Sequence, residues 1–149
     1  MNSTVEVLHE DDFMKMYFDP SIQCIVKEWK QNPSEDKFKL LILNLVHKII
    51  LTRRKYEIDI NLLADCRKLT GELFSEQVID WLNEKIHKMY VANNIRKKAF
   101  VASSEIACNR SLIDYIEQSG GALTGLEMRL FDNIEQAKAW LASSKVNTR

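Results

Sequence analysis

The spacing of hydrophobic residues changes repeatedly along this 149-residue chain, and this change constrains the fold more than any other feature. Alternation of apolar and polar residues predicts a strand, and recurrence every three or four residues predicts a helix. Together the patterns predict the order β-β-α-β-α-β-α-β-α. Strands that alternate with helices favour an α/β fold, with a sheet that is parallel after an opening hairpin.

The opening hairpin is predicted by the segment MKMYFDPSIQCIVKEWK, residues 14–30. Its apolar residues alternate on both sides of Asp19-Pro20-Ser21. Pro20 fixes its own φ for a turn, and the Asp19 carboxylate can accept a hydrogen bond from the backbone beyond it. Two period-two runs around such a turn are typical of a β-hairpin.

The next element is a helix over residues 37–55, with Ser34 as its expected N-cap. Its apolar residues cover more than half of its circumference, which is more than one face of a sheet can cover. The excess predicts contact with another helix, a second subunit or a ligand.

The remaining elements follow from shorter patterns. Apolar segments at 58–63 and 99–102 predict buried strands, and alternation at 126–130 predicts a strand near a sheet edge. Helices are expected over 74–91, from a cap at Ser103 or Ser104 to the glycines 120 and 121, and over 134–143. We expect one domain over residues 1–149, with its core at about 13–142 and flexible termini.

Composition excludes several classes of function. Acidic and basic residues number 21 each, so the chain lacks the basic excess of a nucleic-acid-binding protein. No apolar run approaches the roughly 20 residues of a transmembrane helix. The histidines and cysteines show no metal-ligand spacing, and no cofactor is expected. Cys24, Cys66 and Cys108 are odd in number and widely separated, which predicts reduced thiols and a cytoplasmic location.

The corner LADCRKLTG, residues 63–71, contains the strongest candidates for a site. Asp65 is expected at the carboxyl end of a central strand, where open α/β sheets bind ligands. The alternative is that Asp65 accepts hydrogen bonds from nearby backbone amides or pairs with Arg67. Ser103 and Ser104 offer a similar choice, because a helix start there can hold an anion or be capped by its own serine.

Three segments resemble the SpoIIAA-like proteins, a family related to STAS domains: MYFDPSIQCIVKEWK, LLADCRKL and RLFDNIEQAKAWL. With the order of elements, the resemblance covers about residues 13–142. It implies a mixed sheet with helices mainly on one face, and an interaction or ligand-sensing role without catalysis. The family's loose link to the CRAL-TRIO lipid-binding fold also implies that a small apolar ligand is conceivable.

The resemblance departs from the family at one functional position. In the anti-sigma-factor antagonists, a serine directly after the aspartate of the central strand is phosphorylated to switch partner binding. Cys66 occupies the matching position and cannot carry that phosphate, which leaves Thr70 as a different residue that could be modified.

These observations predict a non-catalytic regulatory or binding domain that binds a protein partner or forms a homodimer. One alternative is a carrier or sensor of a small apolar molecule held between the sheet and helices 37–55 and 74–91. A second alternative is an enzyme that uses Asp65 with Cys66. The candidate residues for binding a partner or ligand are Asp65, Cys66, Arg67, Thr70, Ser103 and Ser104.

Overall fold

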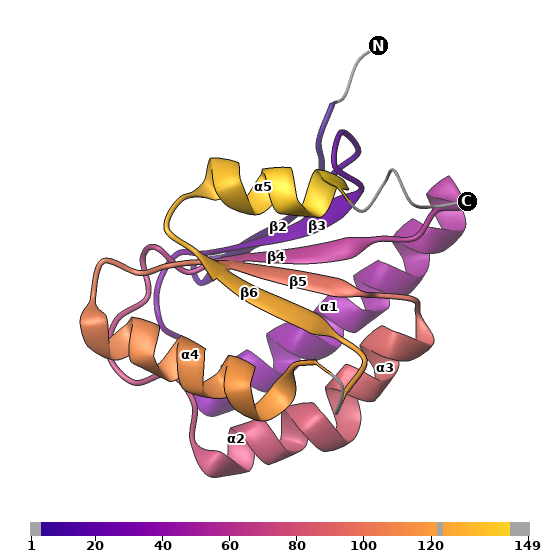
Figure 1. Ribbon diagram of the computed structural model, residues 1–149. Coiled ribbons are helices and arrows are strands. Elements are labelled where there is room, and N and C mark those ends of the chain that lie inside the picture. Colours follow the sequence, from indigo (N-terminus) through magenta and orange to yellow (C-terminus); the bar gives the residue numbers. More distant parts are fainter. Residues whose placement is uncertain (1–3, 122–123, 144–149) are drawn as a thin grey trace.

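The computed structural model describes residues 4–121 and 124–143, which form a six-stranded mixed sheet flanked by helices (Figure 1). The strands are β1 (Glu6–Glu10), β2 (Met14–Asp19), β3 (Cys24–Trp29), β4 (Asn61–Asp65), β5 (Lys97–Val101) and β6 (Glu127–Phe131). They lie side by side in chain order. The pairs β1–β2 and β2–β3 are antiparallel, and the later pairs are parallel.

The helices cover the two faces of the sheet unequally. They are α1 (Glu35–Tyr56), α2 (Glu76–Trp81), α3 (His87–Ala92), α4 (Ile106–Ser119) and α5 (Ile134–Ser143), and the π-helical segment η1 (Leu82–Ile86) joins α2 to α3. Figure 1 shows α5 alone on one face and the other helices on the opposite face. This arrangement confirms the predicted α/β class, with helices mainly on one face.

Each face of the sheet has its own hydrophobic cluster because side chains alternate along a strand. In β4, Leu62 and Ala64 belong to the large cluster beneath α1, whereas Leu63 belongs to the small cluster beneath α5. The central strands are therefore buried on both sides. Any polar side chain at an interior position of these strands must find its partners inside the protein.

The first turn and the first helix form for the local reasons that the sequence gives. Asp19 Oδ1 accepts a hydrogen bond from the Ser21 backbone N–H at 3.0 Å, and β2 and β3 pair as the predicted hairpin. Ser34 Oγ accepts a hydrogen bond from the Lys37 backbone N–H at 3.1 Å, so Ser34 is the N-cap of α1. Both predictions are confirmed.

Three local features differ from the prediction. Strand β1 precedes the predicted start of the core near residue 13, and its side chains are only partly buried, so its apolar pattern is weak. The predicted helix 74–91 is interrupted by η1. The N-cap of α4 is Glu105, not Ser103 or Ser104, and no side-chain hydrogen bond caps that helix.

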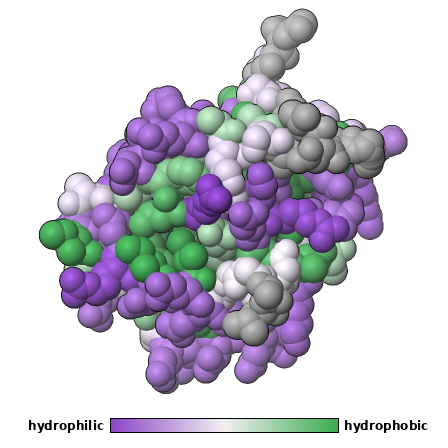
Figure 2. Space-filling view, in the orientation of Figure 1, coloured by the Kyte–Doolittle hydropathy of each residue, from purple (hydrophilic) through white to green (hydrophobic). Residues whose placement is uncertain are grey.

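Hydrophobic side chains remain exposed on part of the surface. Figure 2 shows such a group beside the N-terminal half of α4. In this helix Ile106 is 78% exposed, and Ile113 is also exposed. On α1, Leu40, Leu43 and Leu51 are exposed while the opposite side of the helix is buried. The predicted excess of apolar surface on this helix is thus only partly covered.

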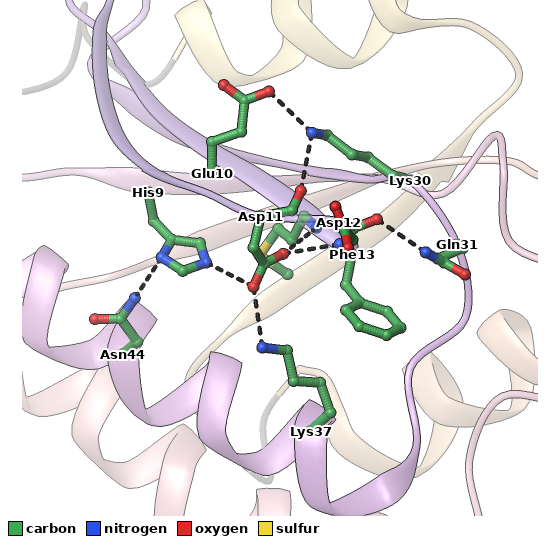
Figure 3. A network of polar contacts seen from close by, with 10 residues as sticks. His9, Glu10, Asp11, Asp12, Phe13, Lys30, Gln31, Lys37 and Asn44 are labelled. Carbon is green, nitrogen blue, oxygen red and sulfur yellow. Dashed lines mark hydrogen bonds and ion pairs between the residues drawn. The ribbon is translucent and has the colours of Figure 1, made fainter.

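A polar network joins the β1–β2 turn to the start of α1 (Figure 3). The Asp11 carboxylate accepts hydrogen bonds from the backbone N–H groups of Phe13 and Met14 at 2.8 and 2.9 Å. It also lies 3.1 Å from Lys37 Nζ and 3.0 Å from His9 Nε2. Burial raises the pKa of Asp11, but these hydrogen bonds outweigh it and hold the pKa well below its ordinary value. We call this group the Asp11 network.

Candidate functional site

A cavity of about 110 Å³ lies between the sheet and helices α1, α2 and α4. The strands contribute Trp29 from the end of β3, Ala64 from β4 and Phe100 from β5, and the helices contribute mainly apolar side chains. The loops that follow β3 and β4 line its other side. The cavity therefore lies toward the carboxyl ends of parallel strands, where open α/β sheets bind ligands.

Two lysine side chains line this cavity, Lys27 from β3 and Lys98 from β5. They are only 2% and 4% exposed. In the sheet register, Lys27 pairs with Ala64 and Lys98 pairs with Leu62, so the two lysines flank β4. Because Ala64 is small, the two side chains have room to reach across β4 on the face that lines the cavity. We call Lys27 and Lys98 the lysine pair.

The environment of the lysine pair disfavours two positive charges. Burial lowers the pKa of Lys27 to about 8. Burial, with the adjacent charge of Lys27, lowers the pKa of Lys98 well below its ordinary value. Each lysine therefore makes a second proton on the pair harder to hold. In residues 4–121 and 124–143, neither lysine takes part in a salt bridge.

Aromatic rings and a buried histidine surround Lys98. Its Nζ lies 4.9 Å from the ring centroid of Phe100, 5.5 Å from that of Tyr115 and 5.6 Å from that of Tyr90. His87 is 1% exposed, with Nε2 at 2.5 Å from the Tyr115 hydroxyl and Nδ1 at 2.8 Å from Asn83 Oδ1. The Asn83 oxygen can only accept, so His87 Nδ1 carries the proton and the Tyr115 hydroxyl donates to Nε2.

The protonation of His87 is set by this environment. Burial, together with the charges of Lys98 and Lys27, lowers the pKa of His87 to about 3. The imidazole is therefore neutral at ordinary pH, and it fixes the Tyr115 ring against one side of the cavity.

The predicted corner lies beside the cavity, but its members have different surroundings. Arg67 Nε and Nη2 donate to the Asp65 carboxylate at 2.9 and 2.6 Å, and the Arg67 backbone N–H donates to Oδ1 at 3.2 Å. These contacts match the structural alternative for Asp65. Cys66 lines the cavity, and burial raises the pKa of its thiol to about 12. A thiol that stays protonated is a weak nucleophile.

The other candidate residues connect this corner to the start of α4. The Thr70 backbone N–H and hydroxyl donate to Asn32 Oδ1 at 2.9 and 3.3 Å. The Ser103 hydroxyl donates to the Leu69 carbonyl at 2.7 Å and accepts from the Glu105 backbone N–H at 3.0 Å. Ser104 is exposed. Their role in binding stays a prediction.

Comparison with known proteins gives one match that covers most of the chain. The model of the SpoIIAA-like family matches residues 24–142. The chain belongs to the SpoIIAA-like family. No curated protein and no solved structure is significantly similar to it. The matched region begins at β3 and contains the lysine pair and every element that lines the cavity, whereas β1 and β2 precede it.

Two further findings concern membrane spans and metal sites in this SpoIIAA-like protein. Within the described ranges, no helix combines the length and apolar character needed to cross a membrane. The same residues include no group of three or more His, Cys, Asp or Glu side chains arranged to hold a metal ion.

The sequence interpretation of this family member overlooked the lysine pair. Lys27 stands between Ile25 and Trp29 in the period-two pattern of the hairpin, and Lys98 stands near the start of the segment KKAFVAS. A lysine at an interior position of a strand that is covered on both faces is rare, because its charge must be buried. That rarity is the signal that could have identified both residues.

Proposed function

We propose that this SpoIIAA-like protein is a non-catalytic binding domain that takes up a small, largely apolar molecule in the cavity beneath α1. The observation that carries the proposal is the cavity itself, because protein interiors are otherwise close-packed. An apolar cavity of about 150 Å³ accommodates benzene, so the 110 Å³ here suits a ligand, or part of one, of roughly five or six heavy atoms. Mostly apolar linings with few polar groups are typical of ligand sites.

The surroundings of the predicted corner support binding rather than catalysis. Asp65 is held by Arg67, and the Cys66 thiol is protonated. Neither group has the geometry of an activated nucleophile with an adjacent base. The buried free thiols of Cys24, Cys66 and Cys108 support our inference that the protein works in the reducing cytoplasm.

The helices that form the cavity also support a sensor role. Helices α1 and α4 both line it, and both carry exposed apolar side chains, including Leu40 and Ile106. A ligand that changes the packing of either helix would change the surface that the helix offers to a protein partner. Binding and regulation are therefore compatible in one domain.

The test combines mass measurement with a variant that fills the cavity. Ala64→Leu adds three carbons to the cavity wall, and Ala92→Leu makes the same change at an exposed position of α3. Native mass spectrometry should show a small molecule bound to the wild type and to Ala92→Leu, and less of it bound to Ala64→Leu. Two four-carbon probes, butyrate and butyramide, should each also raise the melting temperature of the wild type and of Ala92→Leu.

Two results would count against the proposal. One is a wild-type protein that has a ligand-free native mass and is stabilised by neither probe. The other is undiminished binding by a folded Ala64→Leu variant, which would place the ligand elsewhere.

A further inference from the structure

The lysine pair is the least expected feature of the cavity. Burying an ammonium group in apolar surroundings costs several kcal/mol unless an opposite charge compensates it. Within the described part of the chain Lys27 forms no salt bridge, and Lys98, on the other side of β4, is a group of the same charge type. Two buried amines that line one largely apolar cavity and form no salt bridge would be stabilised by a bound anion.

We propose that the ligand carries a carboxylate and that Lys27 and Lys98 each bind one of its oxygens, with its apolar part against the aromatic lining. This inference rests on the proposed function and specifies the chemical class of the ligand. Lys27 and Lys98 flank β4 and both line the cavity, so one carboxylate between them can accept from both. Such charge-assisted hydrogen bonds are stronger than neutral ones.

A carboxylate fits this site better than a phosphate does. The cavity supplies two amines, which match the two oxygens of a carboxylate. A phosphate group brings three terminal oxygens and close to two negative charges, and it would need more donors. Glu35 and Glu72 also line the cavity, and their carboxyl groups disfavour a second negative charge nearby.

The groups that face the lysine pair determine how binding depends on protonation. They are Cys66 directly after β4, His87 and Tyr90 of α3, Tyr115 of α4, Glu35 at the start of α1, and Glu72 in the loop before α2. Burial raises the pKa of the Cys66 thiol and of the two phenols, and it lowers that of His87, so these four groups stay neutral at pH 7. A bound carboxylate favours the protonated form of both amines and so opposes the lowering of their pKa values, which couples binding to proton uptake.

The experiment compares two probes of equal size, butyrate and butyramide, by calorimetric titration at pH 7. The proteins are the wild type, Lys27→Met, Lys98→Met and the control Lys88→Met, which makes the same substitution at an exposed position of α3. The wild type and Lys88→Met should bind butyrate more tightly than butyramide by at least about tenfold. Each cavity variant should lose most of that preference and keep its affinity for butyramide.

Proton uptake gives a second readout that a merely structural role would not produce. Titrations in two buffers of different ionisation enthalpy should show that the wild type takes up a fraction of a proton with butyrate, and that Lys98→Met does not. A further titration with decanoate distinguishes a short acid from the acid end of a longer chain. If decanoate binds more tightly than butyrate, the ligand is the acid end of a longer chain. If it binds more weakly, the ligand is a short free acid.

The possible failures are distinguishable. If butyramide binds the wild type as tightly as butyrate, or if the cavity variants keep their preference for butyrate, the carboxylate inference is wrong while the binding function stands. If neither probe nor a co-purified molecule binds, the proposed function itself fails.

Discussion

Two groups of charged side chains in this protein have opposite surroundings. In the Asp11 network, one carboxylate at the rim of the sheet receives hydrogen bonds from Phe13, Met14, Lys37 and His9 (Figure 3). In the lysine pair, two amines lie in the core without a salt bridge to any described residue. The comparison teaches that a charge paired near a turn stabilises a fold, whereas buried charges without an opposite partner point to a ligand.

The largest expected effect comes from removing the lysine pair. The double substitution Lys27→Met/Lys98→Met replaces two buried amines with apolar side chains of similar length, and it should raise the free energy of unfolding by about 3 kcal/mol. Urea unfolding at pH 7 measures this change. A double variant that is less stable than the wild type would show that the amines hold the fold together, and the contrast with the Asp11 network would disappear.

Removing the charge of the Asp11 network should change the free energy of unfolding in the opposite direction. Asp11→Ala leaves two backbone N–H groups and Lys37 without their acceptor, so it should lower the free energy of unfolding by about 2 kcal/mol. Asp12→Ala is the matched control, because the neighbouring Asp12 side chain is exposed. Urea unfolding of both variants makes the comparison, and equal stabilities would mean that the network contributes nothing.

Lowering the pH should destabilise the fold, because a proton on His87 adds a positive charge beside the lysine pair. The folded-state pKa of His87 is about 3, against 6.5 for the free side chain, so the unfolded chain binds the proton first. The stability linked to His87 is present above about pH 6.5 and is lost as the pH falls toward 3. Between pH 7 and 5.5 the wild type should lose about 1 kcal/mol through this group.

The control for the acid effect is His87→Gln, which removes the titrating group and keeps a side chain that can bond to Tyr115. Its free energy of unfolding should change less than that of the wild type over the same interval. Asp11 and Glu6 have lowered pKa values and therefore act below this window. Parallel curves for the two proteins would show that His87 is not buried in its neutral form.

The success of prediction from sequence differed between local and long-range features. The turn at Asp19-Pro20 and the cap at Ser34 depend on residues a few positions away, and both were predicted. Lys27 and Lys98 are far apart in the chain. They meet only because β3, β4 and β5 are adjacent in a register that places Ala64 between them. A single sequence gives no direct view of that register.

The predicted corner at residues 63–71 shows the same limit of prediction from a single sequence. The sequence placed Asp65 and Cys66 correctly at the end of a central strand. It could not show that alternation along the strand turns Cys66 toward the cavity while Asp65 pairs with Arg67. The face that each side chain occupies depends on which helices cover the sheet, and hence on the whole fold.

The most direct test of our account is a nuclear magnetic resonance titration of lysine side chains with butyrate. The Nζ signals of Lys27 and Lys98 are assigned by their absence from the Lys27→Met and Lys98→Met spectra. We predict that butyrate moves both signals, while Lys88 stays unchanged. Movement confined to exposed lysines such as Lys88, with the two buried signals unaltered at saturating butyrate, would contradict the account.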